Sequence, residues 1–230
     1  PVTYLHRVIR PVVDSLTTKI LPNAQSTVEW LVSMGVPLQK ISLIPNAIDT
    51  DYFNPLHVSH LRQRLEISPT AVVGGFLGRF RSEKRVDVIV SALQSMPIHL
   101  RPDYFLFAGD GPLLATIQQM VNNDTWLRER CIFLGLIQEV RDFFGGIDFL
   151  VLSSILEATP NALLEAMAMA KPVIATCIYD LPQIVQPDVG FLAQPSDAQS
   201  LAEAISQMVS LDSTARLCMG RNARRQVETR

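Results

Sequence analysis

The 230-residue sequence has few charged side chains and no large excess of either sign. Charged residues make up 18% of it and the formal net charge is −2, whereas an average soluble domain is about 25% charged. A nucleic-acid-binding protein needs a basic patch, so this class is excluded. No uncharged apolar run approaches the roughly 18 residues of a membrane span. Hydrophobic residues still make up 48% of the chain, which is enough to bury a core and excludes intrinsic disorder.

The sequence also lacks the patterns that hold metal ions or form disulfide frameworks. Cys131, Cys177 and Cys218 are far apart in apolar contexts, which predicts buried, reduced thiols. Of the four histidines, only His57 and His60 lie close together. No carboxylate pattern joins these two, so we expect surface histidines and no bound metal.

From residue 72 onward, apolar runs of strand length alternate with helical patterns. The expected strands are Val72–Leu77, Tyr104–Ala108, Cys131–Leu134, Phe149–Leu152, Pro172–Thr176 and Gly190–Ala193. Near the end, Ser196 and Gln199 predict the capping box of a further helix. Six strands alternating with helices predict an α/β fold with a doubly wound, mostly parallel sheet. Such sheets bind ligands at the carboxyl ends of their strands.

The elements before residue 72 are shorter. Tyr4–Ser15 has a helical pattern, and Asn23 is the expected cap of a second helix. Lys19–Leu21 and Ile41–Ile44 are expected to be very short strands. Pro45–Pro55 is too polar and too clearly bounded by prolines for a regular element, so it predicts a linker.

The loop after the first strand of the expected sheet carries two cations. Gly78 lets the backbone turn close to a ligand, and Arg79 and Lys84 lie on either side of one strand-to-helix connection. A guanidinium and an ammonium at this spacing suit a diphosphate. A solvated charge run with Glu83 and Asp87 as local partners explains the same residues, and the spacing alone favours that alternative.

The loop after the fourth strand carries the most informative pattern. Thr159 is a candidate helix cap and Pro160 suits the first helical position, so we expect a helix to about Ala170. Glu157 then lies just before the helix, and Glu165 lies in its second turn.

This arrangement predicts an anion site between two carboxylates. Free backbone N–H groups near Asn161–Leu163, with the helix dipole behind them, would attract a phosphate. Acceptor carboxylates on both sides suit a ligand with hydroxyls on both sides of a phosphate, such as a nucleotide sugar. The spacing alone also fits a helix with one favourable acid near its start and a second surface glutamate, and it favours that simpler alternative.

In their order along the chain, the segments PNAID, FLGRF-SEK and FAGDGP and the E-x7-E pattern running into LLEAMA-KPV resemble family 4 of the retaining glycosyltransferases. The resemblance covers nearly the whole chain from about Leu16. It implies the two-domain GT-B fold, in which a C-terminal Rossmann-like domain binds the nucleotide-sugar donor and the N-terminal domain binds the acceptor. It also implies transfer in glycan, lipopolysaccharide or glycolipid biosynthesis without a divalent metal. No cofactor is implied, because the nucleotide-diphosphate sugar is a substrate.

The resemblance also assigns roles to residues. Arg79 and Lys84 would bind the donor diphosphate and Glu157 the hydroxyls of the transferred sugar, which makes these three the predicted catalytic residues. Glu165 would contact the ribose, the backbone of Asn161–Leu164 would meet the phosphates, and the loop Gly135–Ile137 would border the base. The predicted binding residues are Gly78, Leu136, Ile137, Thr159, Asn161, Ala162, Leu163, Leu164 and Glu165.

At three positions the chain departs from the family pattern. Ala47, Ala158 and Ala170 stand where family members usually carry glycine. Glycine suits a positive φ, so alanine costs about 1 kcal/mol wherever that geometry is kept. Ala158 lies nearest to the predicted chemistry, where its methyl would crowd the sugar.

The resemblance further implies that most of the acceptor domain is absent. Residues 1–44 would be the end of that domain, residues 45–55 the linker and residues 56–230 the donor-binding domain. The expected partners are the nucleotide sugar and the missing domain, which would also make any peripheral contact with a membrane. We expect a cytoplasmic protein whose fragment alone transfers no sugar. Two alternatives stay open: a non-catalytic nucleotide-sugar-binding module, and a GT-B epimerase or phosphorylase.

Overall fold

The computed structural model describes residues 16–229 and divides the chain into two compact units, Pro1–Asn46 and Ala47–Arg230. The helix predicted at Tyr4–Ser15 lies outside the described residues. Within the described part, no helix is long and apolar enough to cross a membrane.

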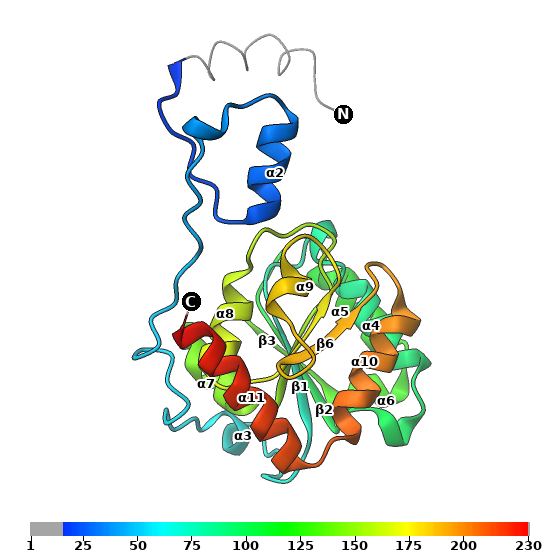
Figure 1. Ribbon diagram of the computed structural model, residues 1–230. Coiled ribbons are helices and arrows are strands. Elements are labelled where there is room, and N and C mark those ends of the chain that lie inside the picture. The colour runs from blue at the N-terminus through cyan, green and yellow to red at the C-terminus, as the bar shows by residue number, and fades with distance from the viewer. Residues whose placement is uncertain (1–15, 230) are drawn as a thin grey trace. The chain divides into compact units, whose positions relative to one another are not determined.

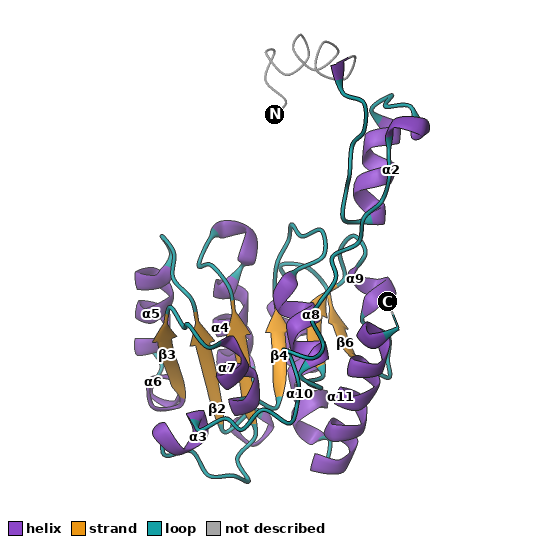
Figure 2. Cartoon of the chain, turned by 90° about the vertical axis from the view of Figure 1, so that its left-hand side faces the viewer, coloured by secondary structure: helices purple, strands orange, loops and turns teal. Residues whose placement is uncertain are grey.

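The larger unit is built on a six-stranded parallel sheet (Figures 1 and 2). Its strand order is β3-β2-β1-β4-β5-β6, so the order reverses between β1 and β4. The doubly wound α/β fold predicted from the sequence is therefore confirmed. The strands are β1 (Val73–Leu77), β2 (Tyr104–Ala108), β3 (Cys131–Gly135), β4 (Phe149–Leu152), β5 (Val173–Thr176) and β6 (Gly190–Ala193).

Helices cover both faces of this sheet, and each face has its own apolar core. One core receives side chains from α3 (Leu61–Arg64), α7 (Val140–Gly146), α8 (Asn161–Ala168), α9 (Leu181–Ile184) and α11 (Ser213–Glu228). The other receives them from α4 (Val86–Ser95), α5 (Leu114–Asn122), α6 (Thr125–Arg130) and α10 (Ala198–Ser210). Short 3₁₀ turns occupy Leu38–Lys40, Ser82–Lys84 and Ile98–Leu100.

In the described part of the smaller unit, residues 16–46, the helix α2 (Gln25–Ser33) lies between two extended segments. The two strands predicted here contribute a single parallel bridge between Ile20 and Ile41. Asn23 does not cap the helix, because Ala24 holds the cap position without a side-chain hydrogen bond. The amide of Asn23 instead donates to Asn46 Oδ1 at 3.1 Å.

The capping box predicted for α10 is wrong by one residue. Asp197 is the N-cap, and its carboxylate accepts hydrogen bonds from the amides of Gln199 and Ser200 at 2.9 and 3.0 Å. Ser196 has a φ of +61° and its hydroxyl accepts a hydrogen bond from Arg85 at 2.5 Å. A carboxylate that serves two amides is a stronger cap than a hydroxyl one residue earlier.

The cysteine prediction is right for one residue and wrong for two. All three thiols are free, and Cys131 is buried, which raises its pKa to about 12. Cys177 and Cys218 are exposed. Cys177 follows the last residue of β5, and Cys218 lies on the solvent side of α11, so neither faces a core despite its apolar neighbours in sequence.

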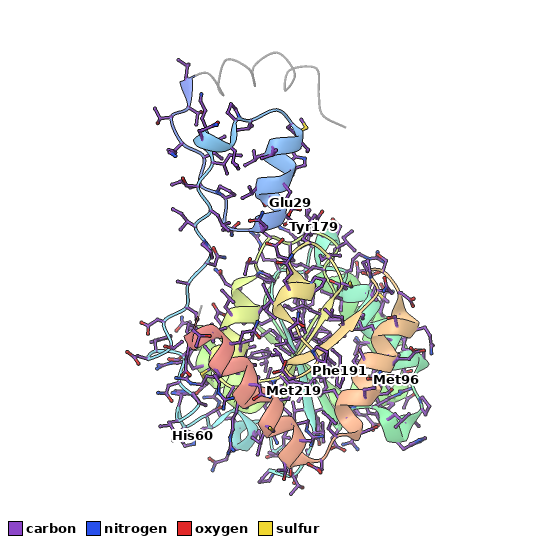
Figure 3. The ribbon with its side chains drawn as sticks, in the orientation of Figure 1. Glu29, His60, Met96, Tyr179, Phe191 and Met219 are labelled. Atoms are coloured by element: carbon purple, nitrogen blue, oxygen red, sulfur yellow. The ribbon has the colours of Figure 1, made fainter. Side chains whose placement is uncertain are left out.

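The two histidines behave differently. His60 is exposed, as predicted (Figure 3). His57 is half-buried, and its Nε2 lies 2.9 Å from Asp142 Oδ1 on α7. Within residues 16–229, no group of three or more histidine, cysteine, aspartate or glutamate side chains is placed to hold a metal ion.

The polar segment after residue 46 is anchored to the larger unit by α11. The guanidinium of Arg224 donates to the carbonyls of Thr50 and Phe53 at 3.2 and 2.8 Å. It also donates to the carbonyl of Ala168 at the end of α8. Tyr52 lies beneath Arg141 of α7, whose guanidinium carbon is 4.0 Å from the ring centroid.

Helix α8 ends in a Schellman motif with alanine at the left-handed position. The amide of Lys171 donates to Ala166 at 2.9 Å, the amide of Ala170 donates to Met167 at 2.9 Å, and Ala170 has a φ of +53°. A Cβ at Gly220 would lie 2.0 Å from the Ala170 carbonyl oxygen, so α11 packs directly on this turn. Of the three alanines that replace the family's glycine, Ala170 alone is at positive φ, so it alone carries the predicted strain.

Replacing Ala170 with glycine should raise the free energy of unfolding by about 1 kcal/mol, because glycine adopts this φ without steric cost. Urea unfolding of the two proteins measures the difference. Ala215→Gly, in the first turn of α11, is the matched control and should lower the free energy, because alanine is under no strain at a helical φ and glycine loses more backbone entropy there. A loss of stability in both variants would contradict the strain at Ala170.

Candidate functional site

The loops that follow β1 and β4 are joined where these two central strands end. Ser153 donates hydrogen bonds to the carbonyls of Lys84 and Arg85 at 2.7 and 2.9 Å. The amide of Ile155 donates to the carbonyl of Glu83 at 2.9 Å. Because β1 and β4 pair in parallel at the reversal of strand order, these loops form the edge where a ligand is expected.

Lys84 and Glu157 form a direct ion pair across these two loops. The side chain of Lys84 is 23% exposed and that of Glu157 is 12% exposed, so the pair is half-buried. The hydroxyl of Ser154 donates a second hydrogen bond to the same carboxylate, and its Oγ lies 2.9 Å from Glu157 Oε1. The structure therefore brings together the cation assigned to the diphosphate and the carboxylate assigned to the sugar.

The local partners that the alternative interpretation gave to Lys84 bind other cations. Asp87 accepts hydrogen bonds from Arg85, with the closest contact at 2.9 Å. Glu83 lies 4.0 Å from Arg81. A simple solvated charge run therefore does not describe the position of Lys84.

Arg79 is exposed and makes no side-chain hydrogen bond or ion pair within residues 16–229. Its loop is fixed by the next residue, Phe80, whose ring is fully buried. The loop also lies against Gly109 and Gly111, where a Cβ would come within 1.9 Å of the Gly78 carbonyl oxygen and 2.6 Å of the Phe80 backbone. These two glycines let the turn after β2 support the loop that carries Arg79.

Glu165 is half-buried on α8, and its carboxylate has no hydrogen-bond or ionic partner in the described part of the chain. Burial raises the pKa of this carboxyl group because water no longer fully solvates the charged form. A half-buried carboxylate without a donor is costly, and a ligand hydroxyl would supply the missing hydrogen bond.

The start of α8 differs from the prediction. Pro160 is the N-cap in extended conformation, with φ −67° and ψ 131°, and the helix begins at Asn161. Thr159 is buried and precedes the N-cap position, where it was expected to stand. The amides of Leu163 and Leu164 donate to the Pro160 carbonyl at 3.1 and 3.5 Å, so two of the predicted phosphate-binding amides are engaged within the helix.

The loop predicted to border the base follows β3, an outer strand of the sheet. Gly135 has a φ of +65°, Leu136 is 79% exposed, and Ile137 packs partly against the core. One strand, β2, separates β3 from β1, so this loop shares the carboxyl edge of the sheet with the loops that carry Lys84 and Glu157 without directly following a neighbouring strand.

Sequence reasoning missed the two serines that end β4. Ser153 and Ser154 are both fully buried, and each donates a hydrogen bond to the loop or side chain of a predicted site residue. The available signal was a pair of hydroxyl residues directly after an apolar strand and three residues before Glu157.

The comparison with known families agrees with this geometry. The model of the family "Glycosyl transferases group 1" matches residues 71–210, more than half of the chain. The chain belongs to this family.

Curated relatives of the family match over most of this chain. N-acetyl-alpha-D-glucosaminyl L-malate synthase of Bacillus anthracis is 30% identical over 192 residues, which cover 83% of this chain and 50% of that enzyme. UDP-Gal:alpha-D-GlcNAc-diphosphoundecaprenol alpha-1,3-galactosyltransferase of Escherichia coli is 28% identical over 193 residues, which cover 82% of this chain and 49% of that enzyme. The chain thus spans about half the length of the curated relatives it matches.

Solved structures show the same fold. Anabaena Alr3699/HepE, in complex with UDP and glucose, superposes with a TM-score of 0.85 at 23% identity, over 97% of this chain and 62% of that chain. The C-terminal domain of the group 1 protein LpcC from Francisella tularensis has a TM-score of 0.67 at 26% identity, over 80% of this chain and 98% of that domain. The described chain is therefore part of a GT-B glycosyltransferase fold, as predicted.

Because the pKa of Glu165 is raised, removing its charge should stabilise the fold, by an amount that depends on pH. The folded state favours the protonated carboxyl more than the unfolded state does, so the ionised group destabilises the fold at neutral pH. Glu165→Gln should therefore be more stable than wild type at pH 7. The difference should vanish as the pH falls to the unfolded pKa of about 4.3.

Urea unfolding at pH 7 and pH 4 measures this difference. Glu129→Gln, at an exposed position on α6, is the matched control and should change stability little at either pH. If Glu165→Gln were less stable than wild type at pH 7, the carboxylate would have a partner within the protein.

Proposed function

We propose that this chain is the donor-binding half of a retaining glycosyltransferase, which binds a nucleotide-diphosphate sugar at the carboxyl ends of β1 and β4. The observation that carries the proposal is the charge arrangement at this edge. Of the two cations that follow β1, Lys84 pairs with Glu157 after β4 and Arg79 is unpaired within the described chain, while Glu165 offers a half-buried carboxylate without a donor. The relative from Escherichia coli, a galactosyltransferase that uses UDP-Gal, supports a uridine nucleotide as donor.

Each charged residue has a role in this proposal. Arg79 and Lys84 bind the diphosphate and stabilise its charge as it leaves the sugar, and the start of α8 adds the positive end of its dipole. Glu157 contacts the hydroxyls of the transferred sugar, and Glu165 accepts from the ribose. In front-face substitution the bond from the anomeric carbon to the phosphate oxygen breaks, the oxygen of the acceptor hydroxyl bonds to the same face, and its proton passes to the departing phosphate. No cofactor takes part.

The acceptor and its binding groups belong to the rest of the protein. We propose that residues 1–44 are the end of the acceptor domain, residues 45–55 the linker and residues 56–230 the donor domain. The acceptor of the Escherichia coli relative carries a lipid, diphosphoundecaprenol. It supports a cytoplasmic enzyme that contacts a membrane peripherally through its acceptor domain. The named relatives are transferases or a synthase, so they give no support to an epimerase, a phosphorylase or a non-catalytic binding module.

The proposal is tested by calorimetric titration of the chain with UDP, GDP and ADP and with UDP-, GDP-, ADP- and CMP-sugars. One nucleotide and its sugar conjugate should bind, and Lys84→Ala should weaken nucleoside diphosphate binding roughly tenfold or more, because charge-assisted hydrogen bonds are lost. Binding of the free nucleoside should not change. Arg128→Ala on α6, near the opposite edge of the sheet, is the control of equal charge. Equal weakening of nucleoside and nucleoside diphosphate would contradict the assignment of Lys84.

Substitution of Glu157, the other member of the ion pair, should change nucleoside diphosphate affinity in the opposite direction to Lys84→Ala. Glu157 holds Lys84 in the structure, so the diphosphate must compete with this carboxylate. Glu157→Gln removes the competing charge and should tighten nucleoside diphosphate binding by about three- to tenfold. The same titrations measure it, and weaker binding would show that Glu157 instead orients Lys84 toward the phosphate.

The chain alone should bind the donor and transfer no sugar. Acceptor groups come from the remaining domain, and holding two reactants together can contribute about 7–11 kcal/mol to lowering the barrier. Incubation with a radiolabelled nucleotide sugar and a panel of lipid and sugar acceptors measures transfer. Product formation by the purified chain would mean that the acceptor site lies within these 230 residues.

A further inference from the structure

The carboxylate of Glu157 has a partner that does not depend on Lys84. Ser154 Oγ donates to Glu157 Oε1 at 2.9 Å, and Ser154 has no exposed surface. The carbonyl of Ser154 in turn accepts a hydrogen bond from Thr176 Oγ1, at the end of β5, at 2.5 Å. The backbone of Ser154 is therefore held by the neighbouring strand, and its hydroxyl is fixed beside the carboxylate.

The preceding residue provides a direct contrast. Ser153 is equally buried, but its hydroxyl donates to the carbonyls of Lys84 and Arg85. Both serines directly follow β4, which ends at Leu152, and their hydroxyls have different partners. One hydroxyl thus holds the backbone of the loop that carries Lys84, and the other holds the side chain of Glu157.

Donor binding would leave the loop that carries Lys84 and the side chain of Glu157 to be held independently, one by Ser153 and the other by Ser154. If the diphosphate binds Lys84, the ammonium is withdrawn from Glu157, whose side chain is only 12% exposed. Within residues 16–229, Ser154 is then the one remaining side chain that donates to this carboxylate. A largely buried carboxylate that loses its cation needs another donor to stay in place.

We propose that Ser154 is a positioning residue that holds Glu157 at the end of β4 while Lys84 binds the donor diphosphate. The carboxylate then stays directed at the hydroxyls of the transferred sugar. This inference rests on the proposed function and adds a residue to which neither the family resemblance nor the comparisons give a role.

The test compares Ser154→Ala with Ser153→Ala, the same substitution at an adjacent and equally buried position. Calorimetry gives the affinity of each variant for the nucleoside diphosphate and for its sugar conjugate, with UDP and UDP-N-acetylglucosamine or GDP and GDP-mannose as probes, whichever pair wild type binds. In Ser154→Ala, the ratio of the sugar-conjugate affinity to the diphosphate affinity should fall roughly tenfold, the value typical of a hydrogen bond to a charged group. In Ser153→Ala, both affinities should fall together, because the whole loop that carries Lys84 is loosened.

A double-mutant cycle shows whether Ser154 acts through Glu157. In a Glu157→Ala background, Ser154→Ala should cause no further change in the affinity ratio. A persisting loss in that background would overturn the positioning role, as would an unchanged ratio in Ser154→Ala alone. Thermal unfolding checks each variant. If Ser154→Ala does not fold, Ser154→Cys, similar in size with a weak donor, gives the same comparison.

The outcomes separate this inference from the function on which it rests. Wild type that binds neither pair of probes would contradict the proposed function and the positioning role together. Wild type that binds a pair, with the ratio unchanged in the serine variant, would contradict the positioning role alone.

Discussion

The parallel pairing of β1 with β4 is the contact on which the site depends. Gly74 pairs with Phe149 and Gly75 with Leu150, although about 75 residues of chain lie between the two strands. The chain reaches β4 only after it has built β2 and β3 on the other side of β1. This reversal leaves no helix between the two loops, so residues far apart in sequence meet at one edge of the sheet.

The electrostatics of this edge follow from that pairing. Lys84 and Glu157 neutralise each other without a ligand, which lowers the cost of keeping two charges half-buried. In the function that we propose, a diphosphate brings more negative charge than one carboxylate and displaces Glu157 from Lys84, and the buried hydroxyl of Ser154 keeps the carboxylate in place. Glu165 has no such compensation, so its charge lowers the stability of the fold, and in our proposal the ribose supplies its missing partner.

The sequence predicted the sheet well because buried parallel strands appear as short apolar runs, and three of the six strands have the predicted bounds: Tyr104–Ala108, Phe149–Leu152 and Gly190–Ala193. Helix starts were harder to predict, because neighbouring residues compete for each cap. Asp197 accepts hydrogen bonds from two backbone amides, although Ser196 was expected to be the cap of α10. Pro160 has an extended backbone, although it was expected to be the first residue of α8. The ion pair between Lys84 and Glu157 joins residues 73 positions apart, so no local pattern could show it. Ser153 was missed for the same reason, because its partners Lys84 and Arg85 lie 69 and 68 positions away.

The central claim is that donor binding takes Lys84 from Glu157 and leaves the carboxylate to the sugar. A crystal structure of the chain with the bound nucleotide sugar tests it most directly. The account predicts the Lys84 ammonium on the diphosphate, and the Glu157 carboxylate on a sugar hydroxyl with its hydrogen bond from Ser154 intact. A bound donor with the Lys84–Glu157 ion pair unbroken, or a donor bound away from the ends of β1 and β4, would contradict it.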